Sequence, residues 1–169
     1  MNLYNKQLPV IHLKPGELYI ARSPTLVITV LGSCVSVTMF DRLKRIGGIC
    51  HGILPEENCN DKSNGSNYYK YKRFHYVDSS IRYMIMKFQS LGIERKDVEI
   101  KIFGGSNMLS SNEGTSRVVA VGRKNIQTAL QTIEEEHLSL IISDVGGTMG
   151  RKIYFYTHKG EILLKKLRK

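Results

Sequence analysis

Apolar runs rich in β-branched residues dominate the first part of the chain and predict β-strands. The run TLVITVL (25–31) and the run VSVTMF (35–40) are separated only by Gly32 and Ser33, which predicts two strands that meet at a tight corner. A third run, IGGICHGIL (46–54), follows a short charged turn and ends before Pro55. Together the three runs predict a meander.

Helical periodicity appears later in the chain. Apolar residues recur at helical spacing over 78–92, where Asp78 is a candidate N-cap and Gly92 a candidate stop. A second helix is expected over 124–137, with an apolar face made of Ile126, Ala129, Leu130 and Ile133. A strand is expected at 98–105 between the helices, and others at 138–144, 152–157 and 161–167.

The polar stretch 56–74 interrupts this pattern. It contains four Asn, two Ser and one Gly, a composition typical of an exposed and mobile loop. No shift of composition marks a boundary elsewhere, so one domain spanning residues 1–169 is expected. At this length a chain can bury roughly 70% of its unfolded surface, and it needs neither disulfides nor a metal to fold.

The composition and the cysteine count bear on the compartment in which the protein is found. No run approaches the roughly 18 apolar residues of a membrane-spanning helix, and the N-terminus lacks a basic segment followed by a hydrophobic one. The three cysteines, Cys34, Cys50 and Cys59, are odd in number and show no repeated spacing, unlike a secreted disulfide framework. A cytoplasmic protein with at least one free thiol is expected.

The formal net charge of +10 raises the alternative of a nucleic-acid binder. Basic residues gather at YYKYKRF (68–74), beside aromatic side chains, and at the C-terminal KKLRK (165–169). Such clusters could stack on bases and pair with phosphates, but they are more commonly solvated surface. No standard nucleic-acid motif is present, so this reading is the weaker one.

Candidate chemistry centres on Cys34, at the corner between the first two strands. A catalytic thiol needs a proton acceptor and donors for an oxyanion, and His51, seventeen residues later, is the candidate acceptor. Backbone N–H groups around Gly32 to Cys34 could form the oxyanion site. The competing interpretation is a core cysteine and a structural histidine. A metal site built from Cys34, Cys50, His51 and Cys59 is disfavoured, because the spacing matches no common zinc pattern.

The motif LGSCVSV (31–37), with the histidine of GGICHGILP (47–55) at that interval, resembles the CheD family of chemoreceptor glutamine deamidases. The later blocks IFGGSNM (102–108), VGRKNI (121–126) and DVGGTMGRKIYF (144–155) resemble the family in content and order. The resemblance covers the chain from about Gly16 to the C-terminus.

This resemblance implies a cytoplasmic enzyme that hydrolyses the side-chain amide of receptor glutamines to glutamate and ammonia. Cys34 would match the family's nucleophile and His51 its general base, and no metal or organic cofactor is implied. The implied fold is α+β, with layered mixed β-sheets and flanking helices, similar to the catalytic domain of deamidating bacterial toxins.

The threonine that supports the histidine in the family is expected six residues before the cysteine, where this chain has Ile28. Thr29 is the neighbouring residue, and adjacent strand residues face opposite sides. Thr29 would therefore replace the family threonine only through a bulge or a shift of register. A backbone carbonyl or another hydroxyl could orient His51 instead. Cys50, next to His51, is expected to point away from the site into the core.

The implied partners are methyl-accepting chemotaxis receptors and, in some relatives, a CheC-type phosphatase of the response regulator. The basic surface would steer the enzyme toward acidic receptor segments, most strongly at low salt. The alternative function is a binding module that docks receptors or the phosphatase without catalysis, or in addition to it. Neither nucleic acid nor membrane insertion is expected.

Overall fold

Two β-sheets and two long helices make up the computed structural model, which describes residues 8–56, 73–107 and 116–167. The strands are β1 (Val10–His12), β2 (Leu18–Ile20), β3 (Leu26–Leu31), β4 (Val35–Asp41), β5 (Ile46–Cys50), β6 (Val98–Gly104), β7 (Ser139–Val145), β8 (Gly150–Tyr156) and β9 (Glu161–Leu167). The helices are α2 (Val77–Ser90) and α3 (Ser116–Glu135), with short 3-10 turns η2 (Arg73–His75) and η3 (Arg95–Asp97).

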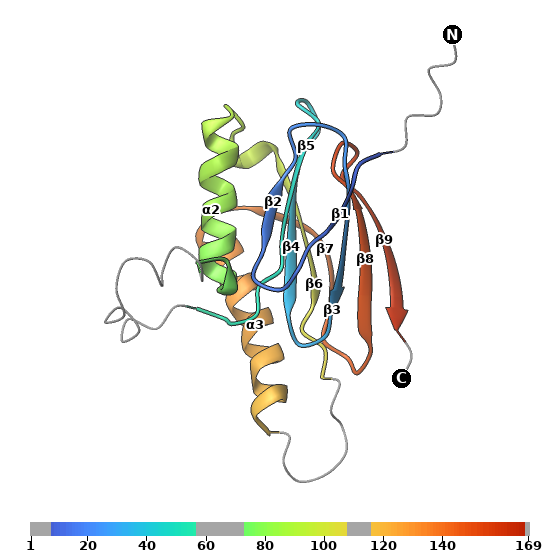
Figure 1. Ribbon diagram of the computed structural model, residues 1–169. Coiled ribbons are helices and arrows are strands. Elements are labelled where there is room, and N and C mark those ends of the chain that lie inside the picture. Colours follow the sequence, from blue (N-terminus) through green and yellow to red (C-terminus); the bar gives the residue numbers. More distant parts are fainter. Residues whose placement is uncertain (1–7, 57–72, 108–115, 168–169) are drawn as a thin grey trace.

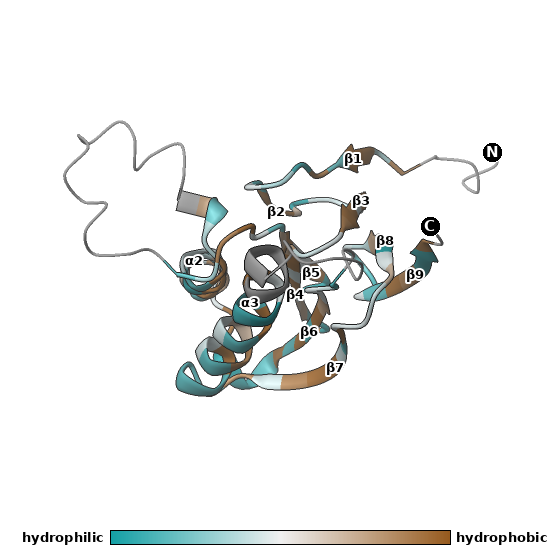
Figure 2. Cartoon of the chain, turned by 90° about the horizontal axis from the view of Figure 1, so that it is seen from below, coloured by the Kyte–Doolittle hydropathy of each residue, from teal (hydrophilic) through white to brown (hydrophobic). Residues whose placement is uncertain are grey.

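The elements stack in three layers. The central sheet has five strands in the order β2-β5-β4-β6-β7, and the outer sheet has four in the order β1-β3-β8-β9. Helices α2 and α3 cover one face of the central sheet, and the outer sheet lies on the other side (Figures 1 and 2). The expected α+β fold of layered mixed sheets with flanking helices is confirmed.

Both interfaces between layers are apolar. The interface between the helices and the central sheet buries Met39, Ile81, Met84, Phe88, Ile100 and Ile102. The interface between the two sheets buries Val27, Leu31, Ile49, Phe103, Ile153 and Phe155. Each such side chain contributes about 1.5–3 kcal/mol by leaving water. Strand β4 is buried along its whole length because it lies in the central sheet between these interfaces.

The predicted meander of the first three runs is wrong. Strand β3 pairs with β1 and β8 in the outer sheet, whereas β4 pairs with β5 and β6 in the central sheet. The chain therefore crosses from one sheet to the other at Gly32 and Ser33. A tight hairpin and a corner between packed sheets have the same local pattern of apolar runs and small residues, so the pattern could not separate them.

Several element boundaries differ from the predicted ones. Helix α2 has Tyr76 as its N-cap residue without a side-chain capping bond, and Asp78 lies in the first turn instead. The stop at Gly92 is confirmed by its left-handed φ of 70° directly after the C-cap. Helix α3 begins eight residues earlier than expected, at Ser116, and Leu130 is 39% exposed, so it does not belong to the buried face. Strand β5 ends at Cys50.

Most of the predicted loop 56–74 lies outside the described residues, which resume at Arg73. The same holds for most of the basic segment 68–74 and for the last two residues of the chain. The single domain over 1–169 stays a prediction. Within the described ranges, no helix is both long enough and apolar enough to span a bilayer.

The turn after β6 approaches the corner at Cys34 so closely that it excludes a side chain at Gly104. A Cβ there would lie 2.2 Å from the Cys34 carbonyl oxygen, and Gly104 has φ 104°. Gly146 also has a positive φ, 73°, but a Cβ there would meet nothing within 4 Å. A side chain at Gly146 would therefore cause backbone strain alone, whereas one at Gly104 would cause backbone strain and a steric clash.

We predict that Gly146→Ala lowers the free energy of unfolding by about 1–2 kcal/mol, the cost of the left-handed backbone alone. Gly104→Ala should lose at least about 2 kcal/mol more, because the corner must also move. Urea unfolding followed by circular dichroism measures both values. Equal losses in the two variants would contradict the close approach at Gly104.

Candidate active site

The corner that carries Cys34 is held by the turn after β6. The N–H of Gly105 donates to the Cys34 carbonyl at 2.8 Å. The backbone N–H and side-chain Oγ of Ser106 both donate to the Gly32 carbonyl, at 2.8 and 2.9 Å. These bonds fix the backbone on both sides of Ser33, and Cys34 itself is a partly exposed free thiol.

His51 follows β5 and is 2% exposed. Its N–H donates to the Glu17 carbonyl at 2.9 Å, and its carbonyl accepts from the N–H of Gly16 at 2.8 Å. The backbone N–H and the carbonyl of His51 are therefore both bound to the segment just before β2.

Cys34 and His51 share one face of the central sheet. Val35 and Gly52 exchange two backbone hydrogen bonds, at 3.0 and 2.8 Å, which extends the antiparallel pairing of β4 and β5. In this register Cys34 and His51 are diagonal neighbours on the face toward the outer sheet, with Cα atoms roughly 7–8 Å apart. The described contacts include no hydrogen bond between the two side chains. Such catalytic hydrogen bonds are often absent without substrate and form only in the substrate complex.

Thr29 reaches His51 from the outer sheet. Its Oγ1 lies 2.8 Å from His51 Nδ1 and donates to the Leu13 carbonyl at 2.9 Å. The buried face of β3 carries Val27, Thr29 and Leu31, in regular register with β8. The expectation that Thr29 needs a bulge or a register shift to meet the histidine is therefore wrong.

The Thr29 hydroxyl determines the tautomer of His51. A hydroxyl has one proton, and this one is donated to the Leu13 carbonyl, so toward His51 the oxygen must accept. Nδ1 therefore carries the proton of the neutral ring, and Nε2 keeps a free lone pair. This assignment follows from the hydrogen-bond network and leaves Nε2 as the atom able to accept a proton.

Burial keeps both groups neutral at physiological pH. Burial lowers the pKa of His51 to about 4, against the opposing effect of the negative charge of Glu17. Burial also raises the pKa of the Cys34 thiol, and the N–H of Cys34 itself partly offsets this rise. The resting pair is therefore a thiol and a neutral imidazole, not a thiolate and an imidazolium.

Two backbone N–H groups at the same corner are candidate donors for an oxyanion. The backbone N–H of Cys34 favours the thiolate and so lowers the pKa of its own thiol. Within the described ranges, no residue accepts a backbone hydrogen bond from Ser33 or Cys34. A carbonyl carbon attacked by the sulfur would place its oxygen near these N–H groups.

Asn125 is a buried residue that the sequence reasoning did not assign to the site. Its Nδ2 donates to the Ser33 carbonyl at 3.1 Å and to the Ile53 carbonyl at 2.9 Å. One amide thus ties α3 both to the corner before Cys34 and to the segment after His51. The only available signal was its place in the block VGRKNI, because an Asn inside a helix does not reveal its tertiary partners.

The last block of the resemblance also folds against the corner. Arg151 is buried and donates to the Asp144 carboxylate and to the carbonyls of Gly146 and Met149, at 2.7 to 3.2 Å. The turn that it holds accepts a hydrogen bond from the N–H of Asn107 at 2.7 Å. Arg151 thus stabilises the glycine turn beside the segment that holds Cys34.

The other cysteines are separated from the corner or lie outside the described residues. Cys50 belongs to the core between the central sheet and the helices, and burial raises the pKa of its thiol to about 12. It faces away from His51, as strand alternation predicts. Cys59 lies outside the described ranges. Among the described residues, no group of three or more His, Cys, Asp or Glu side chains could hold a metal ion.

Comparison with protein families identifies the same family that the sequence motifs resemble. The family model described as CheD, chemotactic sensory transduction, matches residues 53–166. That match begins after His51, so it does not depend on Cys34 or His51.

Whole-chain relatives extend the similarity. A probable chemoreceptor glutamine deamidase CheD 2 of Geobacter sulfurreducens is 46% identical over 167 residues, covering 99% of this chain and 96% of that protein. Proteins named probable chemoreceptor glutamine deamidase CheD are 36% identical in Maridesulfovibrio salexigens, over 94% of this chain and 92% of that protein, and 32% identical in Thermococcus kodakarensis, over 90% and 89%. On the family match and on these identities, the chain belongs to the CheD family.

Proposed function

We propose that this protein deamidates glutamine side chains of chemoreceptors, with Cys34 as nucleophile and His51 as general base. The hydrogen bond between Thr29 and His51 carries the proposal, because it leaves Nε2 unprotonated on the face that Cys34 shares. The relatives' names supply the substrate, a receptor glutamine. A thiol and water suffice for amide hydrolysis, so no metal or cofactor enters the reaction.

The first half of the reaction forms a thioester. His51 Nε2 takes the proton of Cys34 Sγ as the sulfur attacks the glutamine Cδ, and the electron pair of the C=O bond moves to oxygen. The N–H groups at Ser33 and Cys34 donate to this oxyanion, and in other enzymes one such donor supplies about 2.7–4 kcal/mol. The intermediate then expels the amide nitrogen as ammonia, which takes the proton from His51.

The second half restores the enzyme. His51 Nε2 takes a proton from water, and the resulting hydroxide attacks the thioester carbonyl. The C–S bond breaks, glutamate leaves, and the proton on His51 returns to sulfur. One water is consumed and one ammonia released. Thr29 accepts from Nδ1–H throughout, so it can stabilise the transient imidazolium without changing its own protonation.

Two finer expectations extend this proposal. The first is a fold like the catalytic domain of deamidating bacterial toxins, supported by a layered fold that brings a cysteine corner beside a histidine strand. The second is a CheC-type phosphatase as a further partner. A chain that acts only by docking would bind receptors without altering them, which the next experiment separates from catalysis.

We predict that Cys34→Ala abolishes deamidation of a receptor cytoplasmic fragment, because Cys34 is the one thiol that the described residues place at the corner. Mass spectrometry would follow the conversion of –NH2 to –OH on individual glutamines. Cys50→Ala and Cys59→Ser are the matched controls and should retain turnover, although Cys50→Ala loses core packing and some stability. A fully active Cys34→Ala protein would disprove the mechanism, and binding without any mass change by the wild-type chain would favour the docking function.

Thr29→Val should lower kcat by roughly one to two orders of magnitude, part of the 10²–10⁴ that a positioned base contributes. Valine keeps the shape but removes the acceptor of Nδ1–H, so the ring can turn or change tautomer. Thr29→Ser keeps both hydrogen bonds and should restore most of the activity. Ile28→Val, on the opposite face of β3, is the control and should leave kcat unchanged. Equal kcat for Thr29→Val and wild type would show that another group orients His51.

Stability should fall in acid because His51 is buried as a neutral ring. The folded protein takes up this proton only near pH 4, whereas an unfolded histidine takes it up near pH 6.5. Protons therefore favour the unfolded chain as the pH drops from 6.5 toward 4, and the loss at pH 5 relative to pH 7 is about 2 kcal/mol.

Urea midpoints of wild type, His51→Gln and His12→Gln at several pH values test this linkage. His51→Gln should reduce the loss of unfolding free energy between pH 7 and pH 5 by about 2 kcal/mol. His12 is exposed on β1, so His12→Gln should follow the wild-type curve. If the wild-type protein and the His51 variant lose stability in parallel, His51 is not the group responsible.

A further inference from the structure

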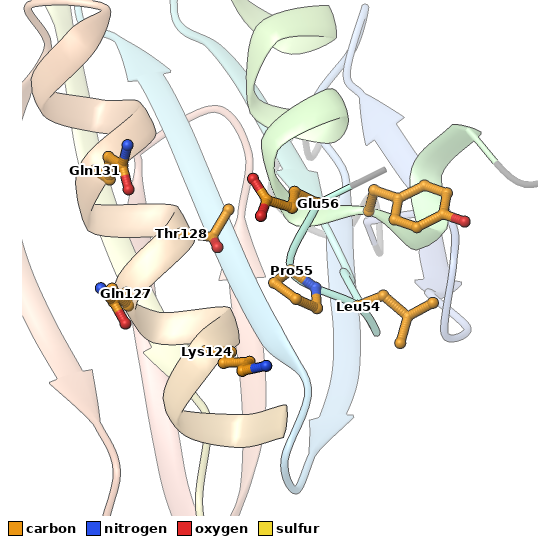
Figure 3. A pocket seen from close by; sticks show the side chains of 8 residues that line it. Leu54, Pro55, Glu56, Lys124, Gln127, Thr128 and Gln131 are labelled. Atoms are coloured by element: carbon orange, nitrogen blue, oxygen red, sulfur yellow. The ribbon is translucent and has the colours of Figure 1, made fainter. Parts of the chain in front are cut away.

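A pocket of about 350 Å³ opens between α3 and the segment Leu54–Glu56. Figure 3 shows polar side chains of α3 on one wall, among them Lys124, Gln127 and Gln131, and the segment Leu54–Glu56 on the other. Its volume lies within the range of about 300–1,000 Å³ that is usual for ligand sites. The mechanism described above makes no use of this pocket.

The pocket begins beside the catalytic corner. Asn125 donates to the carbonyls of Ser33 and Ile53, the residues next to Cys34 and to Gly52. Two residues that line the pocket are sequence neighbours of these hydrogen-bonding groups. Lys124 directly precedes Asn125, and Leu54 directly follows Ile53. Asn125 therefore connects α3 beside the pocket to the corner, which puts the pocket within reach of residues that flank a glutamine at Cys34.

Charge is distributed unevenly along the pocket. Lys124 lies with Leu54 toward one end, whereas Glu56 and Gln131 lie toward the other (Figure 3). Lys124 is adjacent in sequence to Asn125, so the cationic end is the one nearest the corner. An acidic side chain would be attracted there and repelled by Glu56 at the far end. The exposed amide of Gln127 can donate and accept hydrogen bonds along the way. Gln131 donates from Nε2 to the Glu135 carboxylate at 2.8 Å, and its amide oxygen can accept a further bond.

We propose that this pocket binds the part of the substrate polypeptide that flanks the target glutamine, and that Lys124 selects an acidic side chain close to that glutamine. The inference rests on the proposed deamidase function and adds its specificity. Mixed walls of amides, one cation and one anion suit a polar polypeptide surface better than an apolar small molecule. The polar walls supply orientation, and the ion pair determines which glutamines are presented to Cys34.

The test compares Lys124→Glu with Lys165→Glu, which makes the same change of charge on an exposed residue of β9, away from the helices. Each variant would be assayed on a receptor cytoplasmic fragment and on acetyl-glutamine amide, which has no flanking residues. Lys124→Glu should lose roughly tenfold more kcat/KM on the fragment than on the small amide, mainly through KM. Lys165 belongs to the basic C-terminal cluster, so Lys165→Glu should lose only the smaller part of kcat/KM on the fragment that general electrostatic steering supplies, and high salt should remove this loss.

Charge reversal on the substrate makes the assignment specific. Replacing the acidic residue nearest the target glutamine by Lys should impair the wild-type enzyme and restore activity with Lys124→Glu. Equal losses for Lys124→Glu and Lys165→Glu, or no restoration by the reversed fragment, would overturn the proposal. If wild type does not deamidate the fragment, the proposed function fails instead. Fluorescence anisotropy of fragment binding to Cys34→Ala, with and without Lys124→Glu, would then still test the pocket.

Discussion

The hydrogen bond between Thr29 and His51 joins the two sheets close to the corner at which the chain crosses from one to the other. Thr29 belongs to the outer sheet, whereas His51 follows a strand of the central one, so the bond forms only when the sheets are packed in register. The same packing buries Val27, Leu31 and Ile49 around it. Orientation of the imidazole is thus a property of the sheet interface, and the candidate site depends on the tertiary fold more than on any local motif.

Burial explains why this arrangement needs so few polar groups. A charged imidazole would be costly inside the interface, so the ring stays neutral, and one threonine acceptor is enough to fix its tautomer. A carboxylate in that place would stabilise the charged ring and raise its pKa. The hydroxyl instead orients the base without charging it. Asn125 acts in a comparable way on the backbone, since it satisfies two carbonyls on either side of the site with one neutral side chain.

The sequence pattern predicts the strand runs and the helix at 78–92 because both depend on short-range periodicity. It also predicts that the segments carrying Cys34 and His51 lie side by side, because β4 and β5 do pair. Thr29 could not be predicted because alternation holds only along one extended strand. Gly32 and Ser33 form a corner, so counting back from Cys34 does not decide which face residue 28 or 29 occupies. The role of Asn125 depends on contacts between distant segments, which periodicity does not contain.

The raised pKa of Cys34 has a consequence for the lifetime of the protein. Peroxides and disulfides react with the thiolate far more readily than with the thiol, and the fraction ionised falls as the pKa rises. The protonated Cys34 thiol, our proposed nucleophile, is therefore shielded from oxidation and from mixed disulfides, although it is partly exposed. In the proposed mechanism, the sulfur loses its proton to His51 only as it attacks a bound glutamine, so the step that consumes substrate would also limit chemical damage to the enzyme.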